Sequence, residues 1–250
     1  MALRSRFSLF ALRNWVKGRN NPLSRLIYRT IIGLKYFSVP KIPLLHSLLY
    51  QLHTKTLSAW RSFTRIFWYT PLLQSQLKKT APQLYLYGGL PLILGSVEIE
   101  IGANCRVGGG NMNISGRSYG TQIPRLTVGD NCDLGWGSDF MVGRNIHIGN
   151  NVRIAANVFF AGYSGHAFDA KERAAGKGDS EEQVGDIVLE DDVWIASNVT
   201  ILKGVTIGEG TIVGAASVVT KDLPPFVLAA GNPARIIRKL EQETEPKHGA

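Results

Sequence analysis

Branched apolar residues recur at every sixth position in the C-terminal half of the chain. The run consists of Leu189, Ile195, Ile201, Ile207, Val213 and Val219. A period of six matches neither the 3.6-residue turn of an α-helix nor the two-residue alternation of a single strand. It indicates a short unit that stacks on itself, so that each coil buries its apolar residues against the coils above and below. We therefore predict a parallel β-helix built from six-residue segments.

Two further runs upstream have the same spacing. They are Val128, Leu134 and Phe140, and then Val142, Ile148, Ile154, Phe160 and His166. Turn-forming pairs such as Asp130-Asn131 and Asn150-Asn151 lie between ladder positions, where the chain must change direction. The alternative is an antiparallel β domain with frequent turns, but alternation alone does not place branched residues six apart over so long a stretch. We expect the ladder residues to point inward together.

The segments around the last run resemble a known family. They are Asp191-Asp192-Val193-Trp194-Ile195, Gly204-Val205-Thr206-Ile207-Gly208, Ser217-Val218-Val219-Thr220-Lys221-Asp222 and Ala230-Gly231-Asn232-Pro233-Ala234-Arg235-Ile236-Ile237-Arg238. Together they resemble the hexapeptide-repeat acyltransferases, and in particular the branch that includes galactoside, maltose and surface-polysaccharide O-acetyltransferases. The resemblance covers about Glu98 to Leu240. It implies a left-handed β-helix with three faces per coil, a homotrimer with active sites at subunit boundaries, and acetyl-CoA as the acyl donor.

The predicted fold class is mainly β: a left-handed parallel β-helix with an N-terminal α-helical, basic extension. We expect three regions. Residues 1–97 form the basic, aromatic-rich and mostly helical extension, with Thr80 to Val97 as strands entering the β-helix. Residues 98–240 form the acyltransferase domain, and residues 241–250 form a disordered polar tail. Cys105 and Cys132 occupy positions where the repeat requires small inward residues, so both are expected in the core rather than in a disulfide.

The positive charge of the chain lies in the extension. Residues 1–97 hold 14 of the 28 Lys and Arg residues and no Asp or Glu, although the whole chain has a net charge of +9. Leu3, Phe7, Phe10, Ala11 and Trp15 lie on one helical stripe, with Arg4, Arg6 and Arg13 among them. This pattern favours a helix on an anionic membrane surface. The alternative is that these helices pack on the β-helix or on neighbouring subunits. No nucleic-acid motif accompanies the charge, so nucleic acid is not expected as a partner.

The extension is not predicted to cross a membrane. Its uncharged stretches are shorter than about 20 residues or are interrupted by Pro and Gly, and Arg13 interrupts the apolar start in a way that a secretory signal would not. We therefore expect a cytoplasmic protein that associates peripherally with the inner face of the cytoplasmic membrane.

Two interruptions of the ladders, at about Gly108 to Pro124 and Ala167 to Asp186, are candidate places for a site, because loops on a rigid scaffold often carry function. His166 lies where the second begins. Transfer of an acetyl group to a hydroxyl needs a base, and a histidine with a pKa near 6.5 can accept the hydroxyl proton and later release it to the thiolate. In the resembling acyltransferases the catalytic histidine occupies the place of His166.

The same resemblance implies roles for other residues. Ser197 would offer its backbone N–H to the thioester oxygen, where negative charge develops during transfer. Asp139 is the nearest candidate for the polar residue that orients the histidine or the acceptor. The residues implied for the coenzyme A groove are Trp194, Ala215, Thr220, Lys221, Arg235 and Arg238. His166 is followed by Ala167 rather than by the proline of many sugar acetyltransferases, so the acceptor is left open.

We expect no metal, because no histidine pair has ligand spacing on this scaffold and the β-helical carbonic anhydrases need three imidazoles. The expected function is acetyl-CoA-dependent O-acetylation of a sugar, polysaccharide or lipid-linked glycan by direct transfer, with a histidine general base. The alternatives are N-acetylation of an amino sugar, O-acetylation of serine, and a non-catalytic trimeric scaffold.

Overall fold

The computed structural model describes residues 9–120 and 122–241, and the chain forms two compact units that divide between Thr56 and Leu57. The first unit contains α1 (Leu9–Gly18), α2 (Pro22–Tyr36) and the first part of α3 (Pro43–Thr64). The second unit contains the rest of α3, a π-helical turn (Arg65–Tyr69), α4 (Thr70–Gln74) and all of the β-structure.

Local sequence explains where α2 begins. Asn21 is the N-cap, and its side-chain oxygen accepts a hydrogen bond from the Ser24 amide at 2.8 Å. The Ser24 hydroxyl accepts from the Asn21 amide at 3.3 Å, and Pro22 occupies the first turn, where its missing N–H costs nothing. These contacts satisfy amides that a helix start leaves without partners.

The helices of the first unit bury almost none of their apolar side chains. Within the described residues, α1 and α3 contain no buried residue, and Ser24 is the only one in α2. Leu44 is 85% exposed and Leu48 is 63% exposed. None of the helices in the described part of the chain combines the length and hydropathy needed to span a bilayer. The residues Leu3, Arg4, Arg6 and Phe7 of the predicted stripe lie outside the described residues.

The second unit is a parallel β-helix made of three sheets, which we call sheets A, B and C. Sheet A has the strand order β1 (Tyr85–Tyr87), β4 (Arg106–Gly108), β7 (Asp133–Leu134), β10 (Arg153–Ile154), β13 (Trp194–Ile195), β16 (Ile212–Val213), β18 (Val227–Gly231) and β19 (Ala234–Lys239). Sheet B contains β2 (Leu92–Leu94), β5 (Asn113–Gly116), β8 (Asp139–Val142), β11 (Phe159–Ala161), β14 (Thr200–Leu202) and β17 (Val218–Val219). Sheet C contains β3 (Glu98–Ile101), β6 (Arg125–Val128), β9 (Asn145–Ile148), β12 (Ile187–Leu189) and β15 (Thr206–Ile207).

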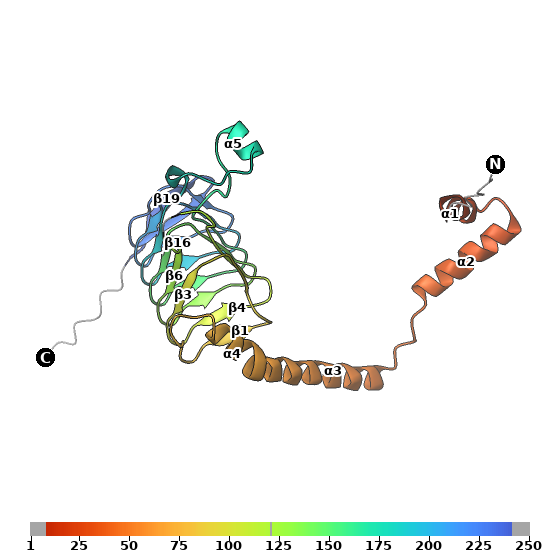
Figure 1. The fold of residues 1–250 in the computed structure, drawn as a ribbon. Helices are drawn as coiled ribbons and strands as arrows, with labels where there is room; N and C mark the ends of the chain where they lie inside the picture. The colour runs from red at the N-terminus through yellow and green to blue at the C-terminus, as the bar shows by residue number, and fades with distance from the viewer. Residues whose placement is uncertain (1–8, 121, 242–250) are drawn as a thin grey trace. The chain divides into compact units, whose positions relative to one another are not determined.

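Each coil passes through sheets A, B and C in turn, so strands that follow one another in the chain lie on different faces (Figure 1). All strand pairs among the described residues are parallel except β18 and β19, which close sheet A as a hairpin. The first strands, in yellow, lie at one end of the β-helix and the blue hairpin lies at the other, while the loop with α5 (Ala170–Ala174) projects from its side (Figure 1).

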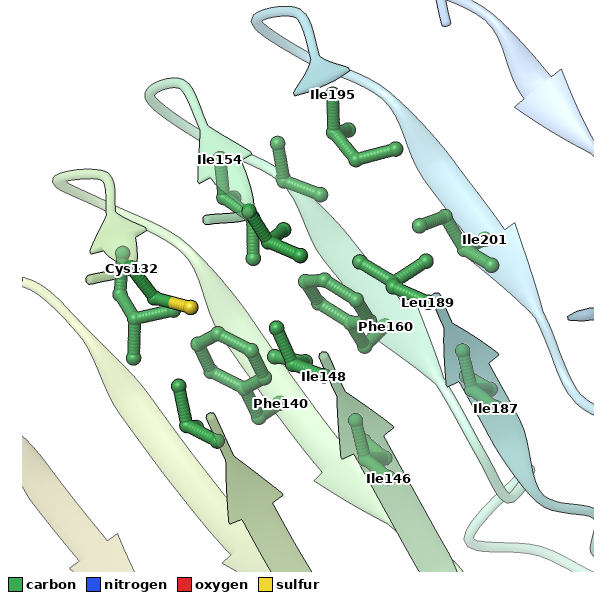
Figure 2. Packing of buried hydrophobic residues seen from close by; sticks show 14 of the residues in the cluster. Cys132, Phe140, Ile146, Ile148, Ile154, Phe160, Ile187, Leu189, Ile195 and Ile201 are labelled. Atoms are coloured by element: carbon green, nitrogen blue, oxygen red, sulfur yellow. The ribbon is translucent and has the colours of Figure 1, made fainter. Parts of the chain in front are cut away.

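The ladder residues form the core, as the six-residue period predicts. All six members of the last run have 0% exposure. Figure 2 shows part of this core as stacked rows, with Ile154 beside Ile195 and Phe140 beside Phe160. The Phe140 and Phe160 rings stack with centroids 4.6 Å apart. Cys105 and Cys132 are fully buried and unpaired, which confirms their prediction as core residues.

Asparagines make the tight turns between sheets. Asn131 and Asn151 have φ values of 54° and 58°, a left-handed conformation that Asn tolerates better than most residues. They lie on adjacent coils, and the Asn131 side-chain amide donates to the Asn151 side-chain oxygen at 2.9 Å. The turn-forming pairs in the sequence therefore lie at the corners, as predicted.

Three boundaries differ from the sequence expectation. Strands β1 and β2 lie within Thr80 to Val97, where we expect strands entering the β-helix, but they already pair with β4 and β5, so the β-helix begins at Tyr85 rather than at residue 98. The first interruption is shorter than Gly108 to Pro124, because β5 continues sheet B and buries Ile114. The second begins at Gly162, where β11 has ended. The expected tail, residues 241–250, lies outside the described residues except for Glu241.

Candidate active site

His166 lies in the long loop between β11 and β12, at the corner between sheets B and C, which we call the B–C corner. Its side chain is exposed, so it does not continue the inward row after Phe160 as the ladder spacing suggested. The chain leaves sheet B before reaching this position, and Ala167 is buried instead. Within the described residues the imidazole has no hydrogen-bond partner, whereas the His166 carbonyl accepts from the Gln183 side-chain amide at 2.7 Å. The ring is therefore free to meet a ligand while its backbone is held.

A buried ion pair braces this loop. The Arg117 Nε lies 2.8 Å from an Asp179 carboxylate oxygen, and the two side chains are 5% and 1% exposed. The other Asp179 oxygen accepts a hydrogen bond from the Gly165 amide at 3.0 Å. Gly165 has a φ of +78°, which favours glycine directly before His166. The contacts thus run from Arg117 through Asp179 to the residue that precedes the histidine.

A second acidic residue strengthens the same connection. Arg117 Nη1 lies 2.6 Å from Glu181, and Arg144 Nη2 lies 3.1 Å from the same carboxylate. These hydrogen bonds, first from Arg117 and then from Arg144, lower the pKa of Glu181. Burial disfavours the charge on Arg117, but the hydrogen bonds to Asp179 and Glu181 outweigh it and raise the pKa of Arg117. Arg117 and Glu181 are therefore charged at neutral pH, and we call these two residues together with Asp179 the clamp.

The clamp was not identified from the sequence. Arg117 belongs to the first interruption of the ladders and Asp179 to the second, 62 residues away. Both interruptions join a strand of sheet B to a strand of sheet C, β5 to β6 and β11 to β12. Counting six-residue segments around the three faces would have placed both loops at the same corner. The opposite charges of Arg117 and Asp179 were then the signal in the sequence that could have predicted their contact.

A second group of predicted residues lies on sheet A and at the corner between sheets A and B, the A–B corner. Trp194 is on the outward face of sheet A and is 50% exposed. Ser197 and Ala215 lie in consecutive turns at this corner, where the Ala216 amide donates to the Ser197 carbonyl at 3.0 Å. In the described part of the chain the Ser197 amide donates no hydrogen bond. An unpaired backbone donor of this kind can bind a carbonyl oxygen as it acquires negative charge.

The two arginines predicted for the groove lie on the closing hairpin. Register pairs Trp194 with Ile212, Ile212 with Leu228, and Leu228 with Arg238. Trp194 and Arg238 thus share sheet A, three strand steps apart. Arg235 pairs with Ala230, and both arginines are exposed.

The remaining predicted residues lie on sheet B. Thr220 and Lys221 directly follow β17, at the B–C corner, and both are exposed. Asp139 begins β8 at the opposite edge of sheet B, where the Asn113 side chain donates to it at 3.4 Å. Within the described residues no contact joins Asp139 to His166. No group of three potential metal ligands occurs among the residues that the structure describes.

Most of the predicted site residues therefore form two groups in one chain. His166, Thr220 and Lys221 lie at the B–C corner. The other group, at sheet A and the A–B corner, comprises Trp194, Ser197, Ala215 and Arg238. Sheet B separates the corners by about five residues of extended chain, roughly 16 Å.

The repeat structure and the comparisons with known sequences indicate the same class of protein. Residues 186–221 match the family described as bacterial transferase hexapeptide (six repeats), and residues 125–159 match the hexapeptide repeat of succinyl-transferase. The galactoside O-acetyltransferase of Escherichia coli K12 is 38% identical over 134 residues, which cover 46% of this chain and 64% of that protein. The polysialic acid O-acetyltransferase of Escherichia coli O1:K1 is 35% identical over 133 residues, covering 52% of this chain and 41% of that protein.

A solved structure supports the fold. AntD, an N-acyltransferase from Bacillus cereus in complex with dTDP and 3-hydroxybutyryl-CoA, superposes with a TM-score of 0.52 at 17% identity, over 68% of this chain and 87% of that one. The chain belongs to the hexapeptide-repeat acyltransferase family and has its left-handed β-helix fold. It spans about half the length of the curated relatives that it matches.

Proposed function

We propose that this protein is an acetyl-CoA-dependent O-acetyltransferase that modifies a hydroxyl of a sugar, polysaccharide or lipid-linked glycan. The observation that carries the proposal is the exposed imidazole of His166 on a loop whose backbone is held by the buried Arg117–Asp179 pair. A scaffold without chemistry has no need to brace an unpartnered histidine in this way. Relatives named as galactoside and polysialic acid O-acetyltransferases favour a glycan hydroxyl as the acceptor.

The proposed reaction is a direct transfer. His166 takes the proton of the acceptor hydroxyl as the oxygen attacks the carbonyl carbon of the thioester. The carbonyl oxygen becomes an oxyanion, for which the free Ser197 amide is the proposed donor. When the C–S bond breaks, the thiolate leaves and takes the proton from the imidazolium. The products are the acetyl ester and coenzyme A, and no acyl-enzyme is formed.

The proposed site is shared between copies of the chain. Because His166 and Ser197 lie at different corners of one β-helix, they can act together only when the B–C corner of one copy meets the A–B corner of another. Contacts between two different surfaces close into a ring when the rotation permits, and a three-sided β-helix suits a ring of three. A homotrimer would therefore hold three equivalent sites, with Trp194 and Arg238 of one copy beside His166 of the next.

The test is the pair of variants His166→Ala and His147→Ala. His147 is also exposed and lies on sheet C, so its loss controls for removing a surface imidazole. We expect His166→Ala to lower kcat for acetyl transfer by about 10²- to 10⁴-fold with coenzyme A binding retained, and His147→Ala to have little effect. Release of coenzyme A from acetyl-CoA with a panel of glycan acceptors measures this. Unchanged turnover in His166→Ala would refute the assignment of the base.

The acceptor panel also decides between the alternatives. Including amino sugars and serine tests for N-acetylation and for serine O-acetylation. A protein that binds no coenzyme A under any of these conditions would instead be the trimeric scaffold.

We further propose that the helices of the first unit attach the protein to an anionic membrane surface. The supporting observation is the number of exposed apolar residues among basic ones, such as Phe10, which is 69% exposed, in α1, whose last turn contains Lys17.

A further inference from the structure

A cavity of about 610 Å³ lies at the first coil of the β-helix, where the π-helical turn contacts β1, and it is lined in part by the end of α3. One wall is formed by the helical residues Trp60, Arg61 and Arg65. The facing wall is formed by aromatic side chains on the outward side of sheet A and in the turn after β7. Two of the helical residues that line the cavity, Arg61 and Arg65, are cationic, and the helix lies outside the hexapeptide repeat.

The aromatic wall consists of Tyr85, Tyr87 and Trp136. The ring centroids of Tyr85 and Tyr87 are 4.7 Å apart, and those of Tyr87 and Trp136 are 5.7 Å apart in an edge-to-face arrangement. The three side chains are 40%, 38% and 57% exposed. Aromatic faces that stay open to solvent can stack against the apolar C–H faces of sugar rings while their polar edges remain hydrated.

The positive charge of the cavity is not neutralised. The Arg65 guanidinium lies 4.3 Å from the centre of the Tyr85 ring. Among the described residues, neither Arg61 nor Arg65 forms an ion pair, and no carboxylate lies among the first 97 residues of the sequence. Arg106 differs, because Asp133 pairs with it. Free guanidinium groups are suited to binding carboxylate or phosphate groups through paired hydrogen bonds.

The cavity continues toward the proposed catalytic region. A second cavity of about 380 Å³ shares Tyr87 and Trp136 with the first and extends along the A–B corner to Ala156. The Ala156 carbonyl accepts from the Asn198 amide at 3.0 Å, so Ala156 lies one coil below the turn that contains Ser197. The two cavities form a groove along this corner that ends one coil below the proposed oxyanion donor.

We propose that this groove binds the acceptor, and that the acceptor is an oligosaccharide whose sugar rings carry carboxylate or phosphate groups. The inference rests on the proposed function, because it places one end of the chain at the transfer site. The aromatic wall binds the sugar rings, Arg61 and Arg65 bind the anionic groups, and the end of α3 selects charged glycans over neutral ones. Coenzyme A is proposed at the other end of sheet A, near Arg238, so the two ligands bind side by side without competing.

The experiment measures binding by calorimetry with the full chain and without an acyl donor, so it succeeds or fails independently of acetyl transfer. The probes are a hexamer of galacturonic acid for the carboxylate, glucose 1-phosphate for the phosphate, and neutral maltohexaose. We expect at least one anionic probe to bind at least 10-fold more tightly than maltohexaose. We expect Arg61→Ala with Arg65→Ala to remove that preference, and Trp136→Ala to weaken binding of every sugar probe.

The matched control is Arg25→Ala with Arg29→Ala, which removes the same charge from the exposed surface of α2 and should leave sugar binding unchanged. Because Arg65 contacts Tyr85, the single variant Arg61→Ala on the exposed helix surface provides the same test without touching the β-helix. In transfer assays the double variant at Arg61 and Arg65 should raise KM for the anionic acceptor at least 10-fold with kcat unchanged.

Four results would overturn the proposal. These are binding of both anionic probes no tighter than that of maltohexaose, displacement of the anionic probe by saturating coenzyme A, equally tight binding of a single-stranded oligonucleotide of matched charge, and a change of oligomeric state in Trp136→Ala by sedimentation. The last result would show that the aromatic wall is a contact between subunits. A failure of transfer with intact anionic-sugar binding would refute only the proposed reaction.

Discussion

At the scale of single residues, the corners of the β-helix depend on side chains that replace missing backbone partners. Asp191 accepts a hydrogen bond from the Asn150 amide on the coil below at 2.7 Å, and it also contacts the Asn150 side chain. The Asn150 amide, followed by its side chain, lowers the pKa of Asp191. The folded protein therefore favours the carboxylate form more than the unfolded chain does.

The first prediction concerns the pH dependence of this contact. A lowered pKa means that the contact stabilises the fold above pH about 4 and that this stabilisation is lost as pH falls through the folded-state pKa. Asp191→Asn should lower Tm at pH 7 by about 2–4 °C, and the difference from the parent protein should shrink by pH 3. Thermal unfolding at fixed protein concentration measures both.

Asp192→Asn serves as the charge control for this experiment. Among the described residues the Asp192 side chain has no hydrogen-bond partner, and asparagine tolerates its φ of 59°. A Tm difference for Asp191→Asn that stays constant from pH 7 to pH 3 would contradict the prediction.

At the scale of elements, the loop between β11 and β12 is held by a buried ion pair as well as by the buried side chains of Ala167 and Val184. Removing one partner of a buried ion pair leaves the other charge without compensation, which commonly costs about 3–5 kcal/mol. Here the loop from Gly162 to Asp186 is continuous with the β-helix at its two ends. It can therefore open and expose the unpaired charge to water, which reduces this cost. Loss of one partner of the ion pair should therefore open the loop before the core strands unfold.

We accordingly predict that Arg117→Met frees the loop. Amide hydrogen exchange within residues 162–186 should rise at least 10-fold while exchange in the strands is unchanged, and kcat should fall because His166 is no longer positioned. Arg144→Met is the matched control, since Arg144 contacts only the exposed carboxylate and carbonyl of Glu181. Unchanged exchange in Arg117→Met would show that the loop is held by other contacts.

At the scale of the whole molecule, the described residues form two kinds of exposed surface. The A–B and B–C corners each carry part of the proposed site, which the proposed homotrimer would bring together. The helices of the first unit expose large apolar residues without burying them. Both observations favour a protein that functions in contact with other copies of the chain and with a membrane surface, as proposed above.

The prediction at this scale concerns the first helix. Deleting Met1 to Asn20 should weaken sedimentation with vesicles that contain anionic lipid by at least threefold, because it removes α1 with its apolar and basic residues. The truncation keeps Asn21 and therefore preserves the cap of α2. Neutral vesicles and high salt are the controls. Equal binding of the truncated and full-length chains would favour packing of the helices between subunits instead.

Much of the architecture could be predicted because the repeat is local. A branched residue every six positions places one inward side chain at the same point of each coil, so Ile195 and Ile201 could be assigned to the core without coordinates. The six-residue spacing did not by itself separate His166 from the inward row, since the spacing continues through it although β11 ends at Ala161. The start of the β-helix at Tyr85 was harder to predict, because the first coil has few apolar residues at the six-residue spacing.

What the sequence determined by itself was the stack of coils, its inward rows and its polar corners, because these depend on spacings that repeat along the chain. Only the tertiary structure shows that Arg117 contacts Asp179 and that His166 and Ser197 lie at different corners. It also shows that Tyr85, Trp136 and Arg61 line one groove. The reason is physical: these neighbours come from separate coils or from outside the repeat. Such contacts are set by how the coils superpose and where each loop leaves them, which local periodicity does not encode.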